Sequence, residues 1–125
     1  MLANRTEQKA ARLAEEFADI YQIEPTSTNA PVYSEVPDLV INATSASLTG
    51  NLPVSDSRMV GKHTVCYDLA YKAEPTPFLQ WAEEHGAAKA IDGKGMLAEQ
   101  AAISFHLWTN HQPVTHEVIE WLGKN

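Results

Sequence analysis

The feature that constrains the fold most is a glycine turn that leads directly into the longest apolar helix of the sequence. The turn is Asp92–Gly95, and the helix is predicted over Gly95–Thr109. Apolar residues lie on nearly every side of this helix, a pattern typical of a buried helix. Gln100 interrupts it, on the face that also carries Gly93 and Met96 at the helical spacing. A buried glutamine needs hydrogen-bond partners, so this face meets either other protein or a polar ligand.

Strands and helices alternate along the rest of the chain, which predicts an α/β fold with a parallel sheet. The predicted strands are Met1–Ala3, Ile20–Ile23, Leu39–Ile41, Thr64–Asp68 and Ala88–Ile91. The other predicted helices are Glu7–Phe17, a helix that begins at Pro77 after the N-cap Thr76 and ends before Gly86, and Thr115–Leu122. Residues 24–37 are predicted to be loop, and residues 46–63 a crossover with a short helix around Ser55–Met59. The continuous apolar run Leu39–Ile41 is typical of a fully buried parallel strand.

Charge and cysteine content exclude several classes of protein. The chain has 125 residues with 9 Lys and Arg against 16 Asp and Glu, a net charge of -7. This balance argues against a nucleic-acid surface and against binding to anionic membranes. No apolar run approaches the ~20 residues of a membrane span, and we expect no signal peptide at the start. The single cysteine, Cys66, excludes an intrachain disulfide, so we expect a cytoplasmic location and an inert core thiol.

Two segments are candidate binding sites. Arg5 and Thr6 precede the first helix and Lys9 lies one turn inside it, so free N–H groups and two cations could hold an anion. Taken alone, this segment fits a capped, solvated helix start better, with Thr6 as the N-cap. Asn42–Ser45 follows a predicted parallel strand, and ligands of open α/β sheets bind at such carboxyl ends. The alternative is a turn of small residues that caps the next segment.

The remaining candidates for a metal site or a phosphate-binding loop are weak. His106, His111 and His116 are five residues apart, a spacing that prevents a shared metal-binding face on a helix. We therefore predict no metal site. Gly93 and Gly95 alone are a weak glycine signal and do not form a phosphate loop.

Five motifs together resemble shikimate dehydrogenase, in order and spacing. They are Asn4–Thr6, Asp38–Ser45, Tyr67–Tyr71, Thr76–Phe78 and Asp92–Gln100. The resemblance covers essentially the whole chain but only the C-terminal half of that enzyme. It implies that residues 1–125 are the C-terminal portion of a Rossmann-type NADP-binding domain with the closing C-terminal helices. The family's N-terminal substrate domain, with its catalytic Lys and Asp, is expected to be absent, so no catalytic residue is assigned here.

The resemblance also implies an activity and a set of site residues. The family transfers hydride between NADP(H) and 3-dehydroshikimate/shikimate, in aromatic amino acid (chorismate) biosynthesis. The implied cofactor contacts are Asn4, Arg5, Thr6, Lys9, Asn42, Ala43, Thr44, Ser45, Leu69 and Gly93. Tyr71 and Gln100 match residues that reach polar groups of the substrate. NAD-preferring Rossmann domains place an acidic residue where Asn4 and Arg5 stand, so NADP is the expected cofactor.

In the strand order of a dinucleotide fold, 3-2-1-4-5-6, the chain is expected to supply strands 3, 4, 5 and 6 of an incomplete Rossmann-like sheet flanked by helices. Strand 4, at Leu39–Ile41, would then be an apolar edge that pairs with another chain or with a displaced N-terminal segment. We therefore predict a homodimer or higher association. We expect the isolated chain to be inactive. Two alternatives stay open: a quinate/shikimate dehydrogenase paralogue that uses NAD, and a non-catalytic Rossmann-like interaction module.

Overall fold

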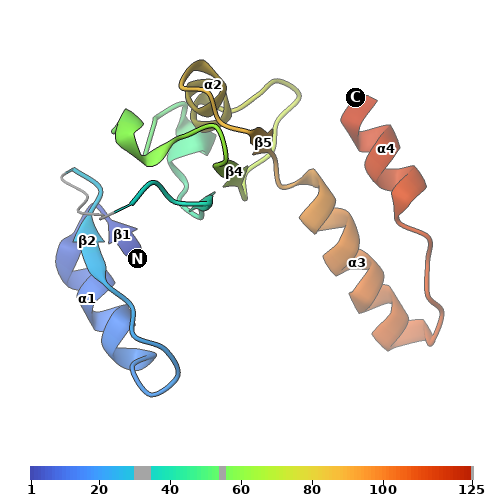
Figure 1. Cartoon of the computed structure of the whole chain (residues 1–125). Coiled ribbons are helices and arrows are strands. Elements are labelled where there is room, and N and C mark those ends of the chain that lie inside the picture. The colour runs from blue at the N-terminus through green and yellow to red at the C-terminus, as the bar shows by residue number, and fades with distance from the viewer. Residues whose placement is uncertain (30–34, 54–55, 125) are drawn as a thin grey trace.

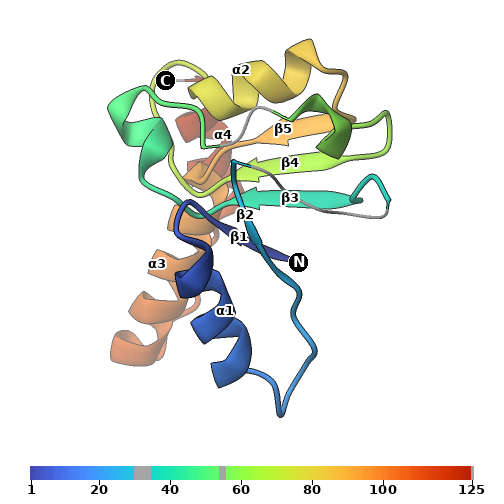
Figure 2. The same ribbon diagram turned by 90° about the vertical axis from the view of Figure 1, so that its left-hand side faces the viewer.

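The computed structural model describes residues 1–29, 35–53 and 56–124, and it has an α/β architecture with two parallel sheets. In the first sheet, β1 (Leu2–Asn4) pairs with β2 (Pro25–Ser27). In the second, β3 (Leu39–Asn42), β4 (Val65–Asp68) and β5 (Lys89–Ile91) lie in the order β3-β4-β5. Figures 1 and 2 show the β1–β2 unit with its helix to one side of the three-stranded sheet. The predicted fold class is confirmed.

The predicted helices are all present, with bounds that differ by one or two residues. They are α1 (Glu7–Glu16), α2 (Pro77–Glu84), α3 (Lys94–Thr109) and α4 (His116–Lys124). Two 3-10 turns lie in the crossover, η1 (Ala46–Thr49) and η2 (Ser57–Met59). The short helix expected around Ser55–Met59 corresponds to η2, while Ser55 itself lies outside the described residues. Within the described ranges, no helix has the length and apolar character needed to cross a membrane.

The core lies between α2 and one face of the three-stranded sheet. Thr76 caps α2, since its hydroxyl accepts a hydrogen bond from the Leu79 amide at 3.4 Å, and Pro77 stands in the first turn. Phe78 is completely buried and stacks on Trp81, with ring centroids 5.9 Å apart. The core residues are Val40, Met59, Val60, Cys66, Phe78, Leu79, Trp81 and Ala82. Burial raises the pKa of the Cys66 thiol, in keeping with an inert core cysteine.

The second strand of the chain lies later than predicted. The amides of Ile20 and Tyr21 both bond to the carbonyl of Phe17 and so extend the turn after α1. Ile20 is 80% exposed, so the predicted strand Ile20–Ile23 is wrong. The strand is β2, inside the segment predicted to be loop, and Pro25 occupies its first position, where a missing N–H is tolerated.

Two segments predicted to be buried are largely exposed. In β3, Val40 is buried under α2 while Leu39 and Ile41 on the opposite face are exposed, so the strand is covered on one face rather than two. In α3, Ala102 is the one buried residue that the structure describes, and Trp108 is 83% exposed. The helix leaves the end of β5 and runs beside α4 instead of entering the core (Figure 1).

The two sheets fit the expected strand order only in part. Both sheets are parallel, and β1 does not hydrogen-bond to β3. The order 3-2-1-4-5-6 would place β2, β1, one further strand, and then β3, β4 and β5 in one continuous sheet. Helix α1 packs on β1 and β2 and buries Ala10 alone among its residues, as expected for a helix that covers a two-stranded sheet. The numbering of the strands stays a prediction.

We propose that the free edge of β3 pairs with a second copy of this chain. β3 is an outer strand of the three-stranded sheet, and its Leu39 and Ile41 are 53% and 55% exposed on the face opposite α2. Exposed apolar edge strands promote association. We expect the sedimentation coefficient to rise with concentration up to tens of micromolar. Ile41→Lys should reduce this rise, because a charge at an edge opposes strand pairing. A single monomeric boundary for the unmodified chain at all these concentrations would contradict the proposal.

Candidate functional site

A polar cleft of ≈ 700 Å³ lies where β1, β2 and β3 end. Asn4 and Arg5 reach it from the end of β1, and Thr28 and Asn29 follow β2. The turn Ala43–Ala46 follows β3 and forms the facing wall. The other lining residues are Thr49, Asn51, Leu52 and Pro53. The cleft therefore brings together the two segments that the sequence predicted as binding sites.

Hydrogen bonds of Asn4 shape the Arg5 side of the cleft. The Asn4 side chain accepts from the Thr6 amide at 2.9 Å, and its backbone carbonyl accepts from the Thr28 amide at 3.2 Å. Thr6 is the N-cap residue of α1, as predicted, with extended backbone, but its hydroxyl makes no capping bond. The side chain of Asn4 closes the turn instead. Arg5 is exposed and has no ion pair within the described part of the chain. Its guanidinium and the first amides of α1 remain available to an anion.

Lys9 lies one turn into α1 and is exposed, but it is not among the residues that line the cleft. Its charge is therefore a neighbour of the Arg5 turn rather than part of the cavity wall.

On the facing wall, Asn42 holds the turn that follows β3. Its side-chain oxygen accepts from the amide and the hydroxyl of Thr44, at 3.0 and 2.8 Å. The Thr44 hydroxyl in turn accepts from the Ala46 amide at 3.2 Å. Asn42 is only 3% exposed, so its side chain lies behind the cleft, while Ala43, Thr44 and Ser45 line it. Of the four residues predicted here, three reach the cavity and one supports them.

Asp68, the last residue of β4, has no role predicted from the sequence. It is completely buried, and its carboxylate accepts hydrogen bonds from Asn42, Ser47, Ala70 and Thr76. The available signal was a carboxylate that ends an otherwise apolar strand, because a buried carboxylate must find donors. Those donors come from separate segments, and their identity could not be inferred from spacing.

Leu69, Tyr71 and Gly93 lie at the ends of β4 and β5. The Gly93 amide bonds to the carbonyl of Ala70 at 3.3 Å. A Cβ at Gly93 would stand 2.8 Å from the carbonyl carbon of Leu69, so this close approach of two backbones requires glycine. Leu69 and Gly93 are thus neighbours, as residues of one site must be.

The two predicted substrate contacts lie outside the cleft. Tyr71 is 45% exposed at the turn after β4. Gln100 is exposed on α3, so the prediction that it is a buried glutamine is wrong, because this face of α3 has no partner among the described residues. Neither residue lines the cavity beside Arg5.

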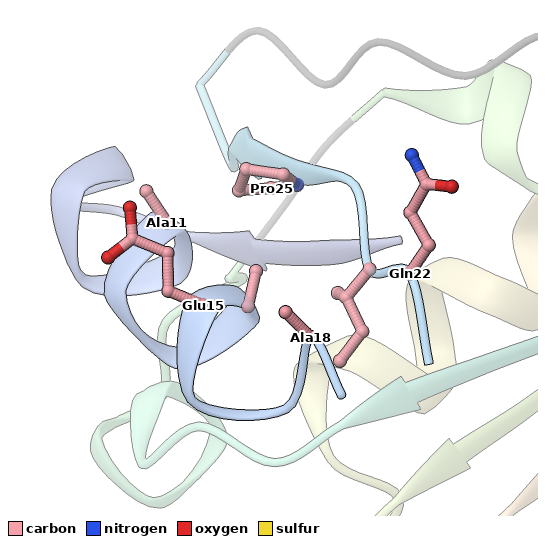
Figure 3. A pocket seen from close by; sticks show the side chains of 7 residues that line it. Ala11, Glu15, Ala18, Gln22 and Pro25 are labelled. Atoms are coloured by element: carbon pink, nitrogen blue, oxygen red, sulfur yellow. The ribbon is translucent and has the colours of Figure 1, made fainter. Parts of the chain in front are cut away.

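A second hollow, of ≈ 430 Å³, lies between α1 and the segment that leads to β2 (Figure 3). Small side chains such as Ala11 and Ala18 line it, with Glu15 and Gln22 at its margin (Figure 3). It contains none of the residues predicted for binding. Among the described residues, no group of three His, Cys, Asp or Glu side chains could hold a metal ion.

The chain was compared with protein families, curated proteins and solved structures. The family model of the shikimate 5'-dehydrogenase C-terminal domain matches residues 93–120. The NADP(+) shikimate dehydrogenase of Colwellia psychrerythraea is 46% identical over 98% of this chain and 44% of its own length. The chain belongs to the shikimate dehydrogenase family. It spans the C-terminal part of these enzymes and less than half the length of the curated relatives it matches.

Solved structures agree with this assignment. An Ael1 enzyme from Pseudomonas putida is 40% identical, with a TM-score of 0.82 over 96% of this chain and 44% of that chain. Shikimate 5-dehydrogenase from Thermus thermophilus, in complex with NADP(H) and shikimate, is 30% identical, with a TM-score of 0.75 over 98% of this chain and 44% of that chain. The curated relatives and the Thermus thermophilus structure are thus dehydrogenases named for shikimate and NADP.

The contact between Gly93 and Leu69 can be tested by substitution. We expect Gly93→Ala to lower the free energy of unfolding by about 1–3 kcal/mol, because the added methyl group forces the two backbones apart. The matched control is Gly95→Ala, where a Cβ meets nothing within 4 Å and the helix gains up to about 1 kcal/mol. Urea denaturation measures both. Equal stability of the two variants would show that the close approach does not exist.

Proposed function

We propose that this chain forms the NADP-binding side of a shikimate dehydrogenase that reduces 3-dehydroshikimate to shikimate with NADPH in aromatic amino acid biosynthesis. The observation that carries this proposal is the cleft that joins the Arg5 turn to the Thr44 turn. These segments are far apart in the sequence, and both follow parallel strands, where dinucleotides bind in α/β sheets.

The residues of the cleft fit NADP better than NAD. Arg5 supplies a guanidinium at the end of β1, in a chain whose net charge is -7. Guanidinium groups bind phosphate with paired hydrogen bonds, and the nearby Lys9 adds a second positive charge. An acidic residue, which would bind a ribose hydroxyl and repel a 2′-phosphate, is absent from Asn4–Thr6. We therefore place the 2′-phosphate at Asn4, Arg5 and Thr6.

When bound, NADPH supplies the hydride. In our proposal, the turn Ala43–Ser45 runs along the cofactor, with its shape fixed by Asn42. Leu69 and Gly93, which approach one another closely, border the nicotinamide. Tyr71 is exposed at the turn after β4, and Gln100 is exposed on α3. We assign both side chains to contacts with polar groups of the substrate.

We expect Arg5→Ala to weaken binding of adenosine 2′,5′-bisphosphate by about tenfold or more, the effect of losing a charged hydrogen bond. Binding of 5′-AMP, which lacks the 2′-phosphate, should change little. The matched control is Arg12→Ala, because Arg12 pairs with Glu16 on the exposed face of α1. Titration calorimetry measures each dissociation constant. Equal losses for both nucleotides, or tight binding of NAD, would contradict the 2′-phosphate site.

We also expect a polypeptide of these 125 residues to show no NADP-dependent oxidation of shikimate. In this family a Lys and an Asp of the N-terminal domain carry out proton transfer, and these two residues have no counterpart among residues 1–125. Absorbance of NADPH measures the reaction, with a full-length relative as the positive control. A rate above the buffer background that scales with the concentration of the chain would overturn this expectation.

A further inference from the structure

We propose that Asp68 is a positioning residue that fixes the wall of the cofactor cleft relative to the turns at the ends of β4 and β5. Its carboxylate acts on the cleft through Ser47 and Asn42 rather than by touching the ligand. This inference rests on the proposed function, because it concerns how one dinucleotide spans the cleft beside Arg5 and the turns after β4 and β5.

The carboxylate lies at the centre of a closed set of hydrogen bonds. Oδ1 accepts from Nδ2 of Asn42 and from the amide of Ala70, both at 3.0 Å. Oδ2 accepts from the hydroxyls of Ser47 at 2.7 Å and Thr76 at 2.6 Å. Asp68, Ser47 and Thr76 are each at most 1% exposed. Among the described residues no cation forms an ion pair with Asp68, so hydrogen bonds alone stabilise this group.

Through these bonds the carboxylate joins the ends of all three strands of the sheet. On the β3 side, Asn42 donates both to Asp68 and to the Ser47 hydroxyl, and its oxygen fixes Thr44 in the cleft. On the other side, the Ala70 amide bonds to Asp68 while the Ala70 carbonyl accepts from Gly93. A displacement at either turn therefore breaks bonds at the same carboxylate.

The two hydroxyl donors have separate consequences. Ser47 belongs to η1. Two other residues of η1, Ala46 and Thr49, line the cleft, whereas Ser47 does not. Thr76 belongs to the cap of α2, on the side of the core. Both donate to the same oxygen, so removing one hydroxyl or the other separates positioning of the cleft from support of the fold.

The test compares Ser47→Ala with Thr76→Val in the 125-residue chain. For each variant, titration calorimetry gives the dissociation constants of NADP+ and of adenosine 2′,5′-bisphosphate, which engages only the Arg5 end. We expect Ser47→Ala to lower the affinity ratio of NADP+ to the bisphosphate by about fivefold to tenfold, the effect of one hydrogen bond. We expect Thr76→Val to lower stability without changing this ratio.

Two further measurements keep the outcome decisive. In Asp68→Asn an N–H donor can replace the oxygen to which the Ser47 and Thr76 hydroxyls donate, and both hydroxyls already accept from Asn42 and Leu79. This variant should therefore lower the ratio as Ser47→Ala does, whereas the control Asp38→Ala, just before β3, should retain the wild-type ratio. Without any ligand, amide exchange at Thr44 should accelerate in Ser47→Ala but not in Thr76→Val. Equal ratios and equal exchange in both variants would overturn the inference. Wild-type chain that binds neither nucleotide would instead contradict the proposed function, and the exchange comparison would still decide the coupling.

Discussion

The buried carboxylate of Asp68 is the interaction on which the arrangement of the sheet ends depends. Moving an ionised group out of water is costly unless every lone pair finds a donor. Here the donors come from the ends of β3 and β4, from η1 and from the cap of α2. Satisfying one side chain thus fixes the relative positions of four segments. The shape of the cleft wall follows, because Thr44 is held by the same asparagine that donates to Asp68.

The cleft itself is a consequence of parallel pairing. Parallel strands of one sheet end at the same side, so the turns after β1 and β2 lie together, and the turn after β3 forms the facing wall of the cleft. The wall beside Arg5 belongs to the two-stranded sheet and the wall beside Thr44 to the three-stranded sheet. The site therefore lies between two units that share no strand pairing in the described structure.

The sequence predicts those features whose physical cause is local. The cap at Thr76, the proline at the start of α2 and the helical spacing of α1 place these helices correctly. Gly93 was marked by its position after a strand, and its close approach to Leu69 explains that glycine. The strand at Pro25–Ser27 could not be predicted, because its pairing with Leu2–Asn4 is set by tertiary contacts and a proline disfavours strands. Likewise, burial of α3 was inferred from its composition, whereas burial depends on what covers a helix. The role of Asp68 could not be predicted, because three of its four donors, Asn42, Ser47 and Thr76, come from separate segments.

The position of Cys66 has a consequence for following this fold in solution. It is the single thiol of the chain, it lies in the middle of β4, and it is fully enclosed by the core. A reagent that modifies thiolates reaches it only when the three-stranded sheet separates from α2, and the raised pKa slows the reaction further. Labelling kinetics at this sulfur therefore report the opening of that layer alone. The β1–β2 unit carries no cysteine, so its opening alone does not change the labelling rate, and the thiol is a probe of the core layer.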